Sequence, residues 1–487
     1  MVITEKIILN SIYKLILEIF KILIPIITLP YIYRKFSPDI MGNIVYSQTI
    51  IDYCVIFSGF GVYSYGLREM SKIRGKKEEM NVLFSNLTLI SFISTILTSF
   101  IYLIYIFLNK DILLKNLMLI NLIQLCVYFL NFEWVNEVFE EYKFISLKSI
   151  LLKGINLILI IILIKNTNDF YIYLLLINFF IVFNNIVSYI YVYHYKKYIK
   201  FSLKKIEILK HIKSLFYIIC IYNIDALYVI FDKILLGTYN DNLEELAYYN
   251  LGHRITMIIK TLLDSLILVS IAQLSEYLGK GLIKKYESLI NEIFSYLSFF
   301  AIPIIIGMIT LNKEILYLIG GKNYIVSSNI FIIFCFRIYI LLIERILTYQ
   351  VLYLNKKEKI AIKILFILGM GGVILKTILI KLEVYSAVYA ILITTILEIL
   401  IIFFNYQYIK KELKYSIEIM DKNCIKYILS SLSFFICYKI IERINNNIYV
   451  IVVGVIFLSI GTYIFILYFL MKDLKLRLIL KKIFWRK

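Results

Sequence analysis

The sequence predicts an all-α integral membrane protein with about 14 transmembrane helices. Two observations predict this class. First, 61% of the 487 residues are hydrophobic and the mean hydropathy is +0.83, whereas soluble domains are roughly 45–50% apolar. Second, apolar stretches fill most of the chain, and Lys and Arg concentrate in alternate gaps between these stretches. This alternation is typical of a helical bundle with a fixed orientation in the bilayer.

Each expected span offers the roughly 20 apolar residues that a bilayer requires. Fourteen such spans leave only short connections, with no room for a soluble domain. The first span carries charges and lacks a small-residue cleavage site, so we expect a retained helix rather than a signal peptide. In chain order the expected spans are 7–33, 41–66, 81–108, 117–139, 149–165, 170–193, 212–236, 246–274, 289–311, 326–353, 362–381, 385–409, 424–441 and 447–470.

Loop charge predicts the orientation of these spans. One set of alternate connections, which includes both ends of the chain, holds 31 Lys and Arg, and the opposite set holds 7. Because basic loops stay on the cytoplasmic side, both termini are expected to be cytoplasmic. The basic end, 471–487, fits an interfacial amphipathic helix or a solvated tail equally well.

Several functional classes find no support in the sequence. The net charge of +20 is spread over many loops, which favours anionic lipid headgroups and topology over nucleic acid as its explanation. No nucleotide-binding or nucleophile-elbow motif occurs, and the six Cys and three His show no metal or disulfide spacing. We expect no cofactor and no metal. The acids near the end of the fourth span are interpreted as an interfacial patch facing nearby Lys; they are Glu133, Glu137, Glu140 and Glu141.

The chain is expected to form two lobes. A long basic connection, 194–211, follows the sixth span, where a linker between two six-helix lobes would lie. Weakly similar segments begin after the first and seventh spans, FSPDIMGNIVYSQTI and LLGTYNDNLEELAYYNLGHRI, as in transporters with parallel repeats. The predicted organisation is an N-lobe with its linker, a C-lobe, and two further spans with a basic tail: 1–211, 212–411 and 412–487.

Charges inside the spans are the main functional signal. In the first span, polar residues spaced three or four apart form one helical stripe, because such residues share a face. The stripe is Asn10, Lys14, Glu18, Lys21 and Pro25. Charges facing lipid each cost about 2.5–3.5 kcal/mol or more, so the stripe is expected to face protein or water. A packed Lys–Glu–Lys group with a purely structural role is the alternative, and Lys14 could also reach the cytoplasmic interface.

Similar charges recur in both lobes and predict an amphipathic cavity for a phosphorylated, sugar-bearing substrate. Basic side chains would hold phosphate oxygens, while acids would balance the charge or couple transport to an ion. A structural ion pair or an interface position near a helix end is the alternative for each residue. The basic candidates are Lys14, Lys21, Lys153, Arg254, Lys260, Arg337, Arg345 and Lys376. The acidic candidates are Glu18, Asp52, Asp225, Asp264, Glu344 and Glu398.

Four segments carry a family resemblance. Arg34 to Gly42 is similar to an R-x-L-G-P-x-x-x-G outer loop, with Phe36-Ser37 in place of Leu-Gly. A G-x-x-x-Y-x-x-R-E pattern follows from Gly61 to Glu69. The segment 131–157 adds Trp134, Glu140, Tyr142 and Lys153, and further similarity lies at 232–255 and 303–334. In this order the segments resemble Wzx-type oligosaccharide flippases, the polysaccharide-biosynthesis branch of the multidrug/oligosaccharidyl-lipid/polysaccharide exporter superfamily.

The resemblance implies a MATE-like fold of two six-helix lobes, plus two C-terminal helices, around a central cavity. It implies translocation of undecaprenyl-diphosphate-linked oligosaccharide repeat units to the outer leaflet of a bacterial cytoplasmic membrane, for O-antigen, capsule or related polymers. The implied mechanism is alternating access coupled to Na⁺, H⁺ or the membrane potential. The implied partners are membrane lipids, a polysaccharide polymerase and its chain-length machinery. The alternatives are a multidrug or small-molecule antiporter of the same fold and a membrane-embedded polysaccharide polymerase or ligase.

Overall fold

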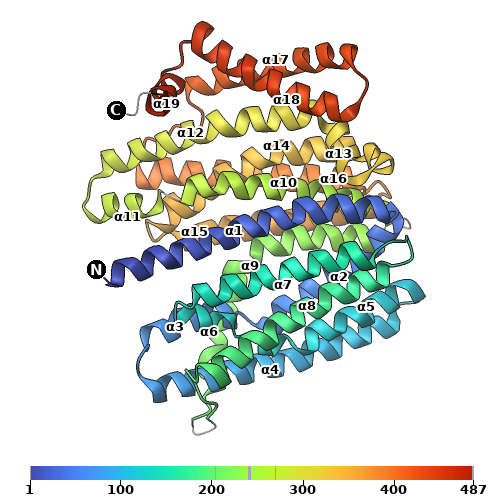
Figure 1. The fold of residues 1–487 in the computed structure, drawn as a ribbon. Coiled ribbons are helices and arrows are strands. Elements are labelled where there is room, and N and C mark those ends of the chain that lie inside the picture. The colour runs from blue at the N-terminus through green and yellow to red at the C-terminus, as the bar shows by residue number, and fades with distance from the viewer. Residues whose placement is uncertain (1, 203–204, 240–242, 269, 485–487) are drawn as a thin grey trace. The chain divides into compact units, whose positions relative to one another are not determined.

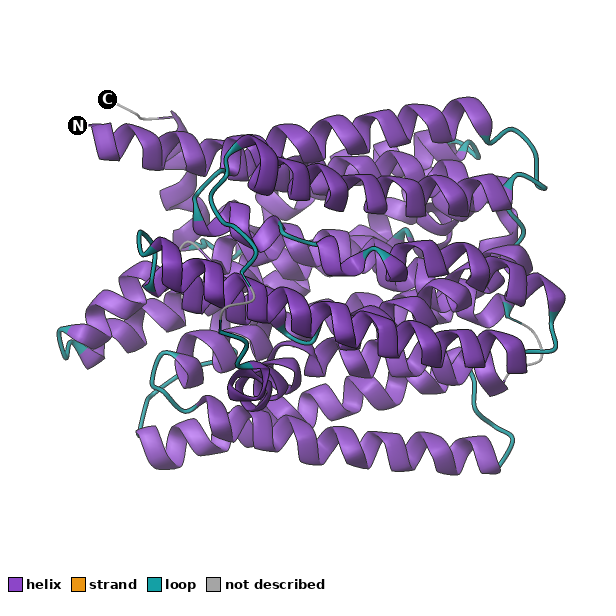
Figure 2. Ribbon diagram, turned by 90° about the horizontal axis from the view of Figure 1, so that it is seen from below, coloured by secondary structure: helices purple, strands orange, loops and turns teal. Residues whose placement is uncertain are grey.

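The computed structural model consists of helices and the loops that connect them (Figure 1), and Figure 2 shows no strand among the described residues. The backbone is described for residues 2–202, 205–239, 243–268 and 270–484. Within those ranges, twelve helical segments are long and apolar enough to cross a membrane. The chain is therefore a multi-pass integral membrane protein, as the sequence predicts. It divides into two compact units, residues 1–247 and 248–487.

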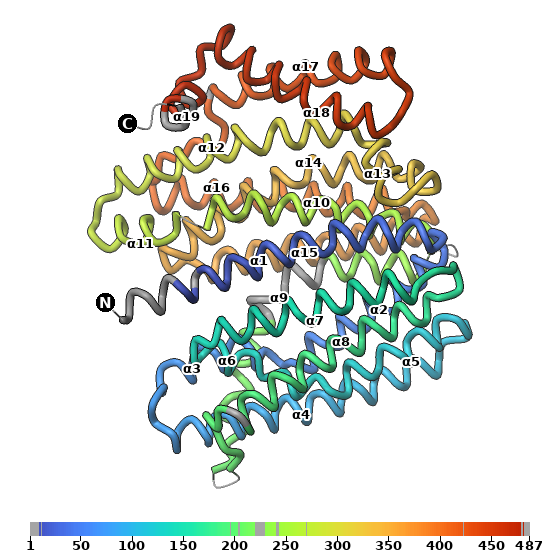
Figure 3. The backbone as a smooth tube through the Cα atoms, viewed as in Figure 1, coloured from blue at the N-terminus to red at the C-terminus, as the bar shows by residue number. Residues whose placement is uncertain are grey.

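Within the described residues, the first unit contains the helices α1 to α9, the shorter turns η1 and η2, and the first residues of α10; their path can be followed in Figure 3. α2 packs against α4, α5 and α9; α1 packs against α7; and α5 packs against α8. The bounds are α1 Val2–Lys35, α2 Pro38–Gly59, α3 Val62–Lys72, α4 Lys77–Leu108, α5 Ile112–Cys126, η1 Tyr128–Leu130, α6 Glu133–Val138, α7 Tyr142–Leu163, α8 Phe170–Ile190, η2 Tyr191–Tyr195 and α9 Ile208–Tyr239.

The second unit takes in most of α10 and the elements that follow it. α12 packs against α17 and α14, α17 against α18, and α16 against both α14 and α15. The bounds are α10 Glu244–Leu268, α11 Ile271–Gly279, α12 Ile283–Thr310, α13 Asn312–Gly320, η3 Lys322–Ser327, α14 Ser328–Arg345, η4 Ile346–Tyr353, α15 Glu358–Lys381, α16 Ala387–Tyr408, η5 Ile409–Leu413, α17 Lys422–Ile444, α18 Ile448–Phe465, η6 Ile466–Leu470 and α19 Leu474–Phe484.

Two of the fourteen expected spans are not among the twelve helical segments that are apolar and long enough to cross a membrane. The expected span 326–353 coincides with α14 and η4, and it carries Arg337, Glu344 and Arg345 within its apolar stretch. The expected span 212–236 falls within α9, part of which has side chains that the structure does not describe. Both segments are helices of spanning length, and the charges of α14 separate it from the more uniformly apolar spans.

Two expected spans are interrupted, which corrects the continuous helices predicted for 41–66 and 117–139. α2 ends at Gly59, and Phe60 and Gly61 take left-handed conformations with φ of 42° and 72° before α3 begins. α5 ends at Cys126 and is followed by the 3-10 turn η1 and the short helix α6. Non-helical backbone inside a membrane is tolerated where protein buries it or where it lines a cavity. Both breaks therefore mark an interior feature of the first unit.

Polar caps fix several helix starts. Asp111 accepts hydrogen bonds from the backbone N–H groups of Leu113 and Leu114 at 2.8 and 3.2 Å. Asp421 caps α17 in the same way, and Asn447 caps α18. Each cap satisfies donors that the first helical turn leaves open. These caps follow short polar connections, so they set where the apolar stretches begin.

A cluster of hydrogen bonds lies between the spans at Glu141. Its carboxylate accepts from Tyr191 at 2.9 Å and from Tyr198, and it lies 3.1 Å from the Lys196 ammonium. Burial favours a higher pKa for Glu141, but these three donors outweigh burial and lower the pKa below its ordinary 4.5. Arg74 pairs with the neighbouring Glu140 at 2.7 Å. These contacts match the interpretation of the acids as a patch that faces basic residues.

Candidate functional site

The second unit brings three sequence-predicted residues together around one carboxylate. On α10, Lys260 and Asp264 lie one turn apart, and the Lys260 ammonium donates to Asp264 Oδ2 at 2.7 Å. From the end of α14, Arg345 Nη1 donates to the same oxygen at 2.9 Å. Lys260 and Asp264 are 9% and 7% exposed. One acid shared by two bases leaves this triad (Lys260, Asp264 and Arg345) with a net charge of +1.

The triad is held in place by a neighbouring amide. Gln350, on η4 just beyond Arg345, is fully buried and donates to the Ile267 carbonyl at 2.7 Å and to the Ser270 hydroxyl at 2.9 Å. These bonds fasten the end of α10 to the segment that follows α14. Because Asp264 lies on α10 and Arg345 directly precedes η4, the Gln350 bonds help to hold these two residues in register.

Arg345 retains donors for a ligand. Its side chain is 32% exposed, and its guanidinium lies 5.8 Å from the centre of the Tyr349 ring. A guanidinium carries five N–H donors in a planar fork, and within the described chain only Asp264 accepts from this one. The remaining donors match the oxygens of a phosphate or carboxylate.

A second basic surface lies on α1 and α7 of the first unit. Lys21 pairs with Glu18 at 2.8 Å, and the two side chains are 46% and 48% exposed. Lys14 lies 5.8 Å from the centre of the Tyr142 ring. Lys153 on α7 is exposed and lies within the electrostatic influence of Lys21 and Glu18. The predicted stripe is therefore not packed away inside its own unit. Together with Lys153 of α7, its two Lys and one Glu give this basic surface a net charge of +2.

Other predicted residues form closed contacts in the second unit. Arg337 on α14 donates to both carboxylate oxygens of Glu398 on α16, with Nε 2.8 Å from Oε2. Their side chains are 5% and 13% exposed, so this bidentate pair links α14 to α16. Lys376 on α15 is buried and donates to Thr394 of α16 at 2.8 Å. Both contacts join α16 to a neighbouring helix.

The remaining predicted residues are dispersed. Arg254 on α10 and Asp52 on α2 are exposed. Glu344 is half-buried and lies 3.3 Å from the Thr348 hydroxyl, one turn further along. The side chain of Asp225 lies outside the described residues.

Sequence reasoning missed a buried lysine in the first unit. The sequence places residue 148 in the connection between the expected spans 117–139 and 149–165. In the structure α7 already begins at Tyr142, and Lys148 is 6% exposed. Its ammonium donates to Glu133 and to Ser188, each at 2.5 Å. The available signal was that the apolar run after residue 148 continues a helix that begins before it, so that Lys148 lies within α7.

Comparisons with known proteins agree with this architecture. A family model described as polysaccharide biosynthesis protein matches residues 7–277, more than half of the chain. No curated protein matches with statistical significance.

Solved structures show the fold. A structure of the lipid II flippase MurJ in an inward closed conformation is 18% identical, with a TM-score of 0.73, and the match covers 96% of this chain and 99% of that one. An inward-facing MATE family multidrug resistance transporter is 12% identical, with a TM-score of 0.58 and coverage of 84% and 96%. The Vibrio cholerae MATE transporter VcmN is 13% identical, with a TM-score of 0.54 and coverage of 85% and 97%. The chain thus has the MurJ/MATE-like fold.

Proposed function

Because the chain belongs to the polysaccharide biosynthesis protein family, we propose that it is a flippase for lipid-linked oligosaccharides. Its substrate is an undecaprenyl-diphosphate-linked repeat unit, carried from the inner to the outer leaflet of a bacterial cytoplasmic membrane. The product then serves a polysaccharide polymerase on the outer side. This activity is transport and leaves the covalent structure of the substrate unchanged.

The observation that carries the proposal is the triad on α10 and α14. A partly exposed arginine with spare donors, beside a buried lysine, sits at a spanning helix. Ionisable groups inside a membrane are costly and usually mark substrate or ion pathways. Arg345 would donate to the diphosphate, and Lys260 would offset the charge of Asp264. A net charge of +1 suits an anionic headgroup.

The basic surface on α1 and α7 supports the same substrate class. Lys14, Lys21 and Lys153 are exposed in that unit, and ammonium groups bind phosphate oxygens as point charges. The exposed Arg254 adds a further cation on α10. We assign the substrate to these accessible cations, and we assign the buried pair Arg337–Glu398 to holding the helices together.

The transport cycle follows from this assignment. Substrate enters from the cytoplasmic leaflet, if both termini are cytoplasmic as the loop charges predict, and alternating access delivers it to the outer leaflet. Coupling to Na⁺, H⁺ or the membrane potential would act through acids such as Asp52 and Glu344.

A multidrug antiporter of the same fold is the competing function, because MATE transporters share the architecture. Cationic drugs are repelled by exposed Lys and Arg inside spanning helices, so the net positive charge of both clusters favours the flippase. A membrane-embedded polymerase would need a catalytic loop on the outer side. The connections with few Lys and Arg, which are expected on that side, are all short, so they disfavour this alternative.

Reconstitution tests the proposal directly. Proteoliposomes would hold a fluorescent undecaprenyl-diphosphate-linked sugar, and loss of fluorescence to an impermeant quencher would report outer-leaflet lipid. Wild-type protein should move the lipid. Arg345→Ala should abolish movement, while Lys410→Ala, an exposed cation outside the triad, should move it normally. Normal movement by Arg345→Ala, or export of a cationic dye in place of the lipid, would overturn the proposal.

A further inference from the structure

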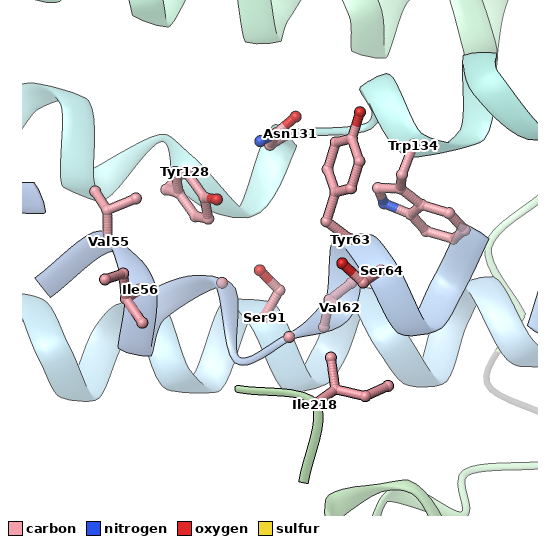
Figure 4. A pocket seen from close by; sticks show the side chains of 12 residues that line it. Val55, Ile56, Val62, Tyr63, Ser64, Ser91, Tyr128, Asn131, Trp134 and Ile218 are labelled. Atoms are coloured by element: carbon pink, nitrogen blue, oxygen red, sulfur yellow. The ribbon is translucent and has the colours of Figure 1, made fainter. Parts of the chain in front are cut away.

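A cavity of about 280 Å³ lies in the first unit, where two spanning segments are interrupted (Figure 4). The break between α2 and α3 contributes Gly59, Gly61 and the first turn of α3. The break between α5 and α6 contributes Tyr128 and Asn131. The cavity involves none of the residues assigned to the headgroup above. It is therefore a separate feature that the proposed headgroup contacts do not explain.

The lining combines aromatic rings with neutral polar groups. The six side chains that matter here are Tyr63, Ser64, Ser91, Tyr128, Asn131 and Trp134, and no ionised side chain is among the described residues that line the cavity. This composition disfavours a metal ion, which would need acidic or imidazole ligands. It also disfavours a lipid tail, because a tail would leave the hydroxyl and amide groups of the lining without hydrogen-bond partners.

Ser91 points to a ligand most directly. The residue is 6% exposed, and its hydroxyl makes no hydrogen bond within the described chain. In Figure 4 this hydroxyl is directed into the cavity, toward the wall that carries Tyr128 and Asn131. Buried hydroxyl groups are normally satisfied, so an open one facing a cavity is expected to bond to something inside it.

Further donors open onto the same space. The indole N–H of Trp134 and the hydroxyl of Ser64 also lack partners within the described chain. α3 starts at Val62 with no side-chain cap. The Tyr65 N–H bonds to the Gly61 carbonyl at 3.1 Å, and the N–H groups of Val62, Tyr63 and Ser64 precede the first intrahelical bond. The Tyr63 hydroxyl, by contrast, donates to Glu137 at 2.9 Å. That acid places negative charge behind the wall and disfavours an anionic ligand.

We propose that this cavity binds one neutral sugar ring, a hexose or an N-acetylhexosamine. Its volume equals that of about nine water molecules, which is enough for a single pyranose ring. The aromatic faces would pack against the C–H face of the ring, while Ser91, Asn131 and the Trp134 N–H would bond to its hydroxyl groups. The assignment rests on the proposed function, because the ring would be one residue of the transported oligosaccharide.

The chain contains a convenient reporter for this site. It has two tryptophans, Trp134 in the cavity wall and Trp485 near the C-terminus. In a Trp485→Phe background, all tryptophan fluorescence comes from the cavity. Free N-acetylglucosamine or glucose should change this fluorescence saturably, in the millimolar range typical of weak small ligands. Saturation-transfer NMR on the same sample gives a second, independent measure of binding.

Matched variants distinguish the cavity from the rest of the protein. Ser91→Ala should weaken binding about fivefold, the loss expected for one hydrogen bond, and Ser91→Leu should abolish it by filling the space. Ser99→Ala is the control, since Ser99 is also a buried serine on α4 with no partner within the described chain, yet does not line the cavity. It should bind sugar like the wild type.

Two results would overturn the proposal. One is the absence of any sugar signal by both methods in protein that melts normally, which would leave the cavity as a water-filled break. The other is equal binding by Ser91→Leu and wild-type protein. If the proteoliposomes move the lipid but no sugar binds, the cavity assignment fails alone. If sugar binds and no lipid moves, the flippase proposal fails alone.

Discussion

Asp264 shows how a single residue sets the charge of the candidate site. Its Oδ2 atom accepts from two cations, and its Oδ1 atom is buried with no partner within the described chain. Lys260 and Asp264 are four residues apart, so their pairing could be predicted from helix geometry. Arg345 is far away in the sequence, and its arrival at the same oxygen depends on packing that no periodicity reveals.

Removing this acid should destabilise the protein strongly. Asp264→Asn would leave the buried Lys260 without its counter-charge, and breaking a buried pair on one side costs about 3–5 kcal/mol. The measurement is the thermal unfolding midpoint in detergent.

Glu276→Gln is the matched control for this change. Glu276 pairs with Lys280 at the same i,i+4 spacing, but both side chains are more than half exposed. The control should unfold like the wild type, because exposed pairs contribute little. Equal midpoints for Asp264→Asn and wild type would contradict the structural role given to the triad.

Glu141 provides a prediction with a defined pH range. Its pKa lies below 4.5 because Tyr198, Lys196 and Tyr191 bond to its carboxylate. A depressed carboxyl pKa stabilises the folded state above the unfolded value near 4.5, and the contribution is lost as the pH falls through the folded pKa. Glu141→Gln should therefore lower the unfolding midpoint at neutral pH and match the wild type in strong acid.

Comparison with an unpaired acid completes that experiment. Glu418 is exposed in the connection before α17 and forms no ion pair within the described chain, so Glu418→Gln should leave the midpoint unchanged at every pH. If the difference between Glu141→Gln and wild type stayed constant down to strong acid, the stabilising role of the Glu141 carboxylate would be disproved.

At the scale of elements, close helix approach at Gly372 gives a sharp test. A Cβ atom there would lie 2.3 Å from Leu397 Cδ1 of α16, whereas the adjacent Gly371 has nothing within 4 Å. Gly372→Ala should therefore be less stable than Gly371→Ala by about 0.5–1.5 kcal/mol, because the end of the Leu397 side chain must leave its preferred rotamer to make room. Gly371→Ala should be neutral or slightly stabilising, since alanine favours helix. Comparing the unfolding midpoints of the two variants checks this; equal midpoints would mean that α15 and α16 do not approach closely.

Helix breaks mark the limit of sequence reasoning about elements. The apolar stretches at 41–66 and 117–139 predict membrane spans, and both are found. Neither interruption is visible in the apolar pattern. At the break after α2, Phe60 takes a left-handed conformation that its residue type does not favour. Gly59 and Gly61 were the available hints, yet glycine is common in spanning helices. The cavity at these breaks could not be predicted for the same reason.

For the whole molecule, charge segregation predicted the fold class, and the MurJ/MATE-like architecture confirms it. The helical bundle could be predicted because apolar stretches of about 20 residues cross a bilayer as helices, and hydropathy locates such stretches in the sequence. The residues that share a site could be predicted only in part. Periodicity grouped the stripe on α1, but the bond from Arg337 to Glu398 depends on how α14 meets α16.

Orientation remains a prediction with a direct test. In a cysteine-free background, Lys110→Cys should react with an impermeant maleimide on intact cells, and Lys77→Cys should react only after the membrane is opened. Both side chains are exposed, so burial does not explain a difference between them. Labelling of residue 77 on intact cells would reverse the orientation inferred from the loop charges.

In the described part of the chain, four helices finish in π turns: η2 after α8, η4 after α14, η5 after α16 and η6 after α18. Such a turn uses i→i+5 hydrogen bonds and takes in an extra residue. Returning that residue to α geometry lengthens the helix by about 1.5 Å. Spare length at the ends of α8, α16 and α18 would let these spans adjust to bilayers of different thickness, whereas η4 is tied to the triad through the Gln350 bonds.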